Sequence, residues 1–167
     1  MRSGLFLLVL LLFGCGYHFP GQGGALPGSV QTLLVPLFIN QTAEPQLEND
    51  LTNRVSERLA RHKQVTVVEQ RERADARLQG TIGHYSSRAI AYDSNDDISE
   101  YQATMVLNVK LLSLSADEVL WQNSLSWQVE YAAANDKALQ QDLEQAAIEE
   151  LNKRLADELL FRLLDDF

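Results

Sequence analysis

The chain has 167 residues, of which 23 are acidic and 14 are basic, so its formal net charge at pH 7 is −9. An acidic balance of this size excludes nucleic acid and bare anionic lipid as expected partners, because both are bound through clustered cations. The single cysteine excludes an internal disulfide, and a hydrophobic content of 46% in a chain of this length suits one domain with its own core.

The first fourteen residues have the three parts of a secretory signal peptide. Arg2 supplies the positive start, an apolar run fills residues 5–13, and the small residue Gly14 precedes the expected cut. The run is too short to cross a bilayer, which takes roughly twenty apolar residues. We therefore predict that residues 1–14 are removed as a signal peptide, which leaves Cys15 at the new amino terminus.

Cys15 stands where a lipid anchor is attached in bacterial lipoproteins. The order Leu12-Phe13-Gly14-Cys15 resembles the bacterial lipobox, although Phe13 replaces the usual small residue. Two or more acyl chains such as palmitate anchor a protein stably, since each buried CH₂ contributes about 0.8 kcal/mol. We predict lipidation of Cys15; an ordinary buried or free cysteine is the alternative. Gly16 at the next position resembles the pattern of outer-membrane sorting.

Residues 15–29 are rich in glycine and proline, which is typical of a tether. A single domain is expected from residue 30 to residue 167. It opens with the β-rich apolar run Thr32–Ile39, in which Pro36 cannot donate to a strand ladder. The run is therefore expected to lie at a sheet edge or to end near the proline.

A helix is predicted after this strand, with Pro45 in its first turn. Its apolar positions recur every four residues and define one buried stripe: Leu47, Leu51, Val55 and Leu59. Short and long strands follow at about 65–68, 76–92, 100–112 and 119–131, joined by hairpins around 93–99 and 115–118. In the strand 76–92, we expect Leu78, Gly80, Ile82 and His84 to share one face.

The two strands 100–112 and 119–131 alternate between apolar and polar residues. Such strands have one face on the core and one face open. The last helix is capped by Asn135-Asp136 and carries leucines at four-residue intervals, reaching roughly 40 Å, so that its end near Phe167 is expected to project. The element order predicts an α+β two-layer sandwich, with a mixed, mostly antiparallel sheet of four to five strands and two helices on one face.

The open face of the sheet is rich in Gln, Ser, Thr and Asn. Residues such as Gln122, Ser124 and Gln128 suit a surface that exchanges water for the hydrogen bonds of another protein without desolvating full charges. We predict that these three residues contact a partner. An ordinary solvated antiparallel face produces the same pattern and remains the alternative.

Catalysis finds little support in the sequence. His18, His62 and His84 lie in unrelated segments, and the chain has no second cysteine and no motif for a nucleophile, a phosphate loop or zinc. The cluster of Asp93, Asp96 and Asp97 lacks the glycine and distal glutamate of a calcium-binding loop. We predict a protein that is not an enzyme and that holds no metal or cofactor.

Several segments, in their order and spacing, resemble the LptE family of lipopolysaccharide-assembly lipoproteins. They are Cys15-Gly16-Tyr17-His18-Phe19, the stretch 35–42, the stretch 74–82, Glu100-Tyr101-Gln102 and Val119-Leu120-Trp121. The resemblance implies a Gram-negative outer-membrane lipoprotein on the periplasmic face. It also implies that the domain plugs the β-barrel LptD and helps to assemble it, so that the pair inserts lipopolysaccharide into the outer leaflet.

The resemblance further implies contact with lipopolysaccharide through basic residues near the hairpin 93–99. Here the sequence departs from the family, because Asp93, Asp96 and Asp97 dominate and Arg88 is the nearest cation. Arg88 is therefore the candidate glycolipid contact. An auxiliary lipoprotein of a lipid-trafficking ABC transporter is the alternative function, and an enzyme is a more distant one.

Overall fold

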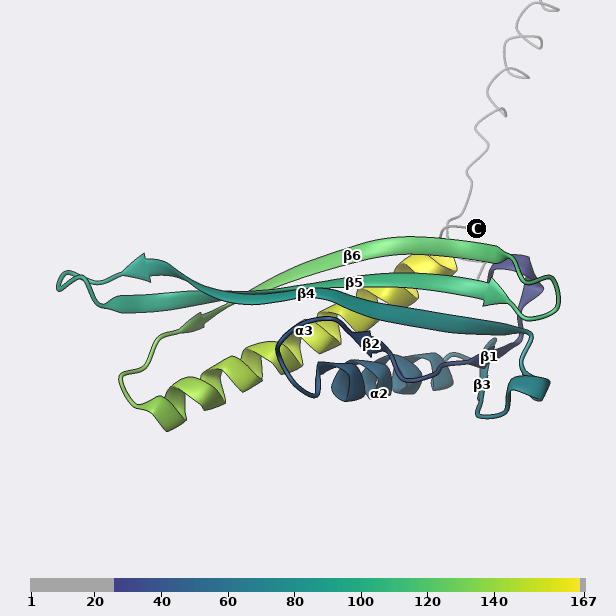
Figure 1. Ribbon diagram of the computed structural model, residues 1–167, viewed down its shortest axis with the longest axis horizontal. Helices are drawn as coiled ribbons and strands as arrows, with labels where there is room; N and C mark the ends of the chain where they lie inside the picture. The colour runs from purple at the N-terminus through teal and green to yellow at the C-terminus, as the bar shows by residue number, and fades with distance from the viewer. Residues whose placement is uncertain (1–25, 166–167) are drawn as a thin grey trace, which may run out of the picture.

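A six-stranded mixed sheet and two long helices form two layers in the computed structural model, which describes residues 26–165 (Figure 1). The strands are β1 (Thr32–Leu34), β2 (Ile39–Asn40), β3 (Thr66–Val68), β4 (Ala76–Tyr92), β5 (Ile98–Ser113) and β6 (Val119–Ala132). The helices are α2 (Leu47–Ala60) and α3 (Lys137–Asp165), with short 3-10 turns η2 (Pro27–Ser29) and η3 (Arg71–Arg73). The strand order is β3-β1-β4-β5-β6, and β2 pairs with β4. The predicted α+β two-layer sandwich is confirmed, but the sheet has six strands where four to five were expected.

The additional strand arises because the predicted run Thr32–Ile39 is broken in two. β1 ends at Leu34, β2 begins at Ile39, and Pro36 lies in the gap. β1 runs parallel to both β3 and β4 and lies between them, so it is not an edge strand. The other expectation, that the strand ends near Pro36, is confirmed, since proline has no N–H to donate to a strand ladder.

The three long antiparallel strands carry most of the core on one face. The inward residues of β5 are at most 1% exposed: Ala103, Met105, Leu107, Val109 and Leu111. Both helices cover this face, and α3 contributes the fully buried leucines 151, 155 and 163 (Figure 1). Burial of one such side chain contributes about 2 kcal/mol, which explains why the alternating pattern fixes the register.

The folded part begins earlier than residue 30. Leu26 is 2% exposed, Pro27 is buried, and a Cβ on Gly28 would lie 3.2 Å from the side chain of Leu120 in β6. Leu26 and Pro27, which the sequence analysis assigns to the tether, thus pack on the domain. The predicted signal peptide, Cys15 and residues 16–25 lie outside the described residues.

The last helix begins as predicted, with Asp136 Oδ1 accepting a hydrogen bond from the Leu139 N–H at 2.9 Å. Its two ends differ in exposure, however. Leu163 is fully buried, whereas Leu139 near the start is 51% exposed. The helix packs on the core as far as Leu163, and the end near Phe167, which is expected to project, lies outside the described residues. Among the residues that the structure describes, no helix is long and apolar enough to cross a membrane.

Candidate functional site

The candidate site is the face of β4, β5 and β6 that points away from the helices. The β5–β6 register pairs Lys110 with Gln122, Asn108 with Ser124 and Thr104 with Gln128. Directly opposed residues of an antiparallel pair share a face, so the three predicted contact residues of β6 lie on one surface. All three are exposed.

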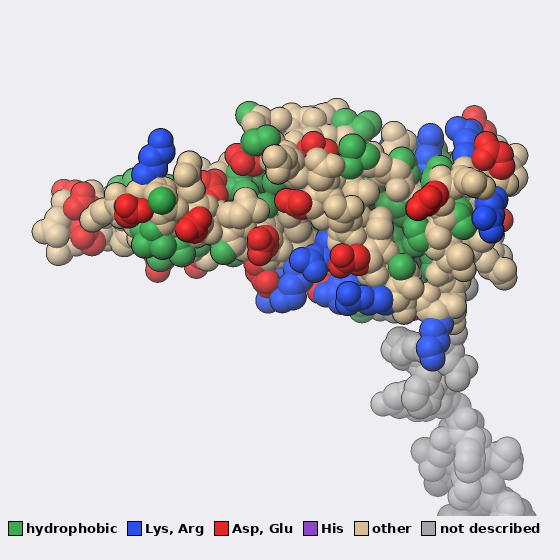
Figure 2. Space-filling view, turned by 90° about the horizontal axis from the view of Figure 1, so that it is seen from below, with side chains coloured by type: hydrophobic (Ala, Val, Ile, Leu, Met, Phe, Trp, Pro, Cys, Tyr) green, Lys and Arg blue, Asp and Glu red, His purple; other side chains and the backbone are tan. Residues whose placement is uncertain are grey.

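We call the centre of this surface the polar sheet face. Its members are Thr81, His84 and Ser86 of β4, Thr104, Val106 and Asn108 of β5, and Gln122, Ser124, Ser126 and Gln128 of β6. None of them is an acid, a lysine or an arginine. Charged side chains adjoin it at both ends: Lys110 lies directly opposite Gln122 with Arg77 beyond it, and Arg88 and Glu130 lie at the other end. The opposite side of the molecule, seen in Figure 2, carries many charged side chains of both signs.

His84 lies on this face because β4 contains a bulge at Gly83. The register with β5 shifts between Ile82 and His84, so that His84 is paired with Val106, and the next inward position falls to Tyr85. His84 is exposed, with Nε2 3.1 Å from Ser86 Oγ. The prediction that His84 shares a face with Ile82 is therefore wrong. The overlooked signal was the isolated glycine in a strand pattern, which indicates a bulge.

Gly83 lies close to the end of the Asn108 side chain, an exposed amide that can move aside for a larger residue. A Cβ on Gly83 would lie 2.9 Å from Asn108 Nδ2, closer than real Cβ contacts allow. The bulge thus brings the β4 backbone against a side chain of the polar sheet face.

Arg88, the predicted glycolipid contact, borders the polar sheet face near the β4–β5 hairpin. It is exposed, and its Nη2 donates a hydrogen bond to Gln102 Oε1 at 2.9 Å. At the hairpin tip, Asp93 Oδ1 accepts hydrogen bonds from the N–H groups of Asn95 and Asp97, at 2.7 and 3.1 Å. Asp93 therefore stabilises the turn. In the described part of the chain, no group of three or more His, Cys, Asp or Glu is arranged to hold a metal ion.

Two tyrosines of the sheet form hydrogen bonds through their hydroxyl groups, one to α3 and one within the sheet. Tyr85 donates a hydrogen bond to Glu144 Oε1 of α3 at 2.9 Å, and burial, followed by this hydrogen bond, raises the pKa of Tyr85. The hydroxyl of Tyr131 lies 2.7 Å from Ser87 Oγ, and burial raises its pKa as well. Tyr131 also stacks on Tyr101 at a centroid distance of 5.5 Å. These contacts could not be predicted from the sequence, because the partners are distant in the chain.

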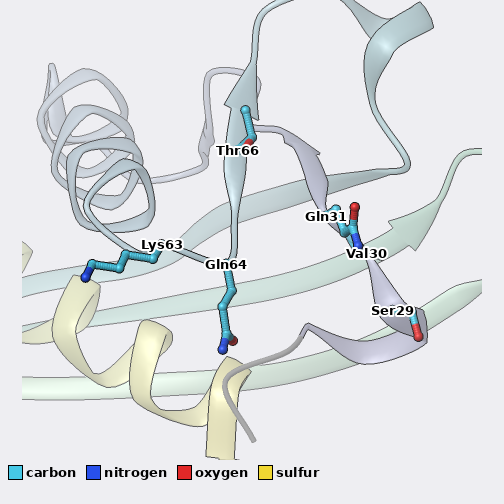
Figure 3. A pocket seen from close by; sticks show the side chains of 6 residues that line it. All are labelled: Ser29, Val30, Gln31, Lys63, Gln64 and Thr66. Atoms are coloured by element: carbon cyan, nitrogen blue, oxygen red, sulfur yellow. The ribbon is translucent and has the colours of Figure 1, made fainter.

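A separate hollow of about 540 Å³ lies at the other end of the sheet, beside β1 and β3 (Figure 3). Its lining includes one charged residue, Lys63, and no carboxylate. Figure 3 shows Lys63 and Gln64 extending in different directions, with Ser29 on the far side. The hollow therefore does not bring together a nucleophile, a base and an acid.

Solved structures of other bacterial proteins share this fold. A Xanthomonas campestris protein of the DUF330 family superposes with a TM-score of 0.61 at 19% identity, over 88% of this chain and 89% of that one. The rare lipoprotein B of Shewanella oneidensis gives a TM-score of 0.54 at 15% identity, over 78% and 91%. Lipoprotein B of Nitrosomonas europaea gives 0.53 at 17% identity, over 89% and 90%. At these identities the likeness shows the fold alone.

The sequence itself carries the family relationship. No curated protein sequence is significantly similar to this chain. The family model described as LptE, lipopolysaccharide-assembly, matches residues 30–163, which is nearly all of the folded part. The matched region contains β4, β5, β6, α2 and nearly all of α3, and therefore the whole polar sheet face. The chain belongs to the LptE family of lipopolysaccharide-assembly proteins.

Proposed function

We propose that this protein is an outer-membrane lipoprotein that plugs the LptD β-barrel from the periplasmic side and supports its assembly for lipopolysaccharide insertion. The observation that carries the proposal is the uncharged polar sheet face, which spans three strands in a chain with a net charge of −9. An acidic protein that leaves one broad face free of acids has concentrated its charge elsewhere.

The chemistry of this face matches the wall of a barrel lumen. Lumen-facing residues of outer-membrane barrels are polar, so a plug has to replace water by hydrogen bonds to that wall. Amides and hydroxyls do this at a smaller desolvation cost than carboxylates or ammonium groups. Gln122, Ser124, Ser126 and Gln128 present such groups along the exposed side of β6 as far as Glu130.

A lipid anchor on Cys15 supports the same proposal. Anchoring confines the domain to the inner surface of the outer membrane, which raises its effective concentration around a barrel embedded in that membrane.

A plug that acts by occupying space needs no catalytic group, and we propose that the protein is not an enzyme. Arg88 is the proposed contact for lipopolysaccharide, since its guanidinium is an outward cation beside the polar sheet face.

The proposal is tested by adding charge to the polar sheet face. A variant with Gln122→Glu, Ser124→Glu and Gln128→Glu should retain the fold, because all three side chains are exposed, but should co-purify with LptD at least about tenfold less, since unpaired charges would be buried. The matched control places three glutamates at exposed positions elsewhere, Asn49→Glu, Gln70→Glu and Gln141→Glu. Equal co-purification of both variants would favour an ordinary solvated face. Capture of an ABC transporter component in place of the barrel would favour the alternative function.

A further inference from the structure

A polar groove of about 520 Å³ crosses the helix layer, on the side of the molecule opposite the polar sheet face. It lies where the start of α2 meets the middle of α3 (Figure 1). Hydrogen-bonding side chains of both helices line it: Gln46, Asp50, Asn53, Gln145, Glu149 and Asn152. We call it the α2–α3 groove.

Asn152 has an unsatisfied acceptor at this groove. The residue is 3% exposed, and its Oδ1 atom has no hydrogen-bond partner among the described residues. A buried polar atom without a partner costs about 1–3 kcal/mol. Nearly all buried polar atoms in folded proteins are paired, so this one points to a donor that comes from outside the domain.

The charges of the other lining residues favour a donor that is positively charged. Asp50 and Glu149 form no ion pair with any other residue in the described part of the chain. The one cation of the lining, Arg54, has its Nη1 3.8 Å from Glu57 Oε2, one turn further along α2. The lining of the groove therefore comprises two carboxylates, four amides and one arginine, and the arginine pairs with Glu57, a residue outside the lining. No group of three metal-ligating side chains occurs there within residues 26–165.

We propose that the α2–α3 groove binds the guanidinium group of an arginine on a partner polypeptide. Guanidinium is planar and carries five N–H donors in a fixed fork, which suits acceptors that are spread over two helices. The three N–H donors of a lysine ammonium share one nitrogen atom, so they match acceptors that are spread over two helices less well. The inference rests on the proposed function only in requiring a polypeptide partner. Its contact surface is separate from the polar sheet face.

The groove is tested first with small cations on the purified protein. Ethylguanidinium, n-butylammonium and tetramethylammonium are titrated while the side-chain amide signals of Asn53, Gln145 and Asn152 are followed by NMR. Ethylguanidinium should shift these signals saturably and at the lowest concentration. Asn152→Leu and Glu149→Gln should each weaken its binding about tenfold, the loss expected for one hydrogen bond or ion contact to a charged group. Asp142→Asn is the matched control, since it removes an exposed carboxylate of α3 outside the groove.

Shifts that rise linearly without saturation, equal shifts with tetramethylammonium, or unchanged binding in Asn152→Leu would overturn the proposal. Tighter binding of n-butylammonium would overturn the choice of guanidinium. At the level of the partner, Asn152→Leu should reduce co-purification about fivefold, whereas Asp142→Asn should leave it unchanged. If charge on the polar sheet face abolishes capture but Asn152→Leu does not, the groove fails as a contact and the proposed function stands. If neither change affects capture, the proposed function fails as well.

Discussion

Asp75 joins the start of the first strand to the start of the fourth. Its Oδ2 atom accepts hydrogen bonds from the N–H groups of Thr32 and Gln31, at 2.8 and 3.1 Å, and its own N–H lies 3.0 Å from Thr32 Oγ1. These contacts, the Thr32 backbone first, lower the pKa of Asp75 below its ordinary value of 3.8. One exposed carboxylate thus stabilises the parallel pairing of β1 and β4, which has few backbone hydrogen bonds of its own.

We expect Asp75→Asn to lower the free energy of unfolding by about 1 kcal/mol at pH 7, because a charged acceptor is replaced by a neutral one. A group whose pKa is lowered in the folded state contributes stability above its unfolded pKa and loses it as the pH falls through the folded pKa. Urea unfolding of both proteins at several pH values should therefore show the difference at neutral pH and none in strong acid. A difference that persists below the lowered pKa would contradict this role.

Gly80 is required by a neighbour in the core. A Cβ at this position would lie 2.6 Å from the ring of Phe38, which is 3% exposed and belongs to the segment between β1 and β2. Gly80→Ala should therefore destabilise the protein by about 1–3 kcal/mol, the usual range for overpacking. Thermal unfolding measures it, with Gln79→Ala on the open side of the same strand as the control. Equal melting temperatures for the two variants would contradict the close contact.

At the scale of elements, α3 is fixed to the sheet by a polar contact as well as by leucines. The Tyr85 hydroxyl donates to Glu144, and both side chains are partly buried. Tyr85→Phe should lower the free energy of unfolding by about 1–2 kcal/mol, because Glu144 loses its donor. Double-mutant cycles with Glu144→Gln and Glu144→Ala check this. Additive effects of Tyr85→Phe and Glu144→Ala would show that the hydrogen bond contributes nothing.

For the strands and helices, some features are predicted by the sequence and others are not. Alternation in β5 and β6 predicts their register and their open face, since burial of one face leaves no other solution. Leucines at four-residue spacing predict both helices. The end of the first strand near Pro36 was expected, and the bulge at Gly83 had a sequence signal, an isolated glycine, that was overlooked. The start of the fold at Leu26 could not be predicted, because the packing there depends on a side chain distant in the sequence, Leu120.

At the scale of the whole molecule, the predicted contact residues of β6 could be placed on one face from the sequence, whereas the α2–α3 groove could not. A strand pattern fixes which residues face the same way, but a groove between helices depends on their crossing. Asn152 is one polar residue in a leucine stripe, and only the structure shows that its Oδ1 has no donor among the described residues.

The proposed function requires that the domain is held at a membrane. We expect Cys15→Ala to yield an uncleaved or unanchored precursor, because no thiol remains to be alkylated before the signal is removed. Mass spectrometry and membrane fractionation of both proteins check this. Normal acylation and fractionation of Cys15→Ala would contradict a lipid anchor at that residue.

The central claim is that the polar sheet face lies against the wall of LptD. The most direct measurement is photo-crosslinking in cells from a residue introduced at Ser126, in the middle of that face and opposite Val106. The account predicts a crosslink to an inward-facing residue of the LptD barrel. Absence of a crosslink to LptD in cells that assemble functional barrels, or a crosslink to a transporter component, would contradict it.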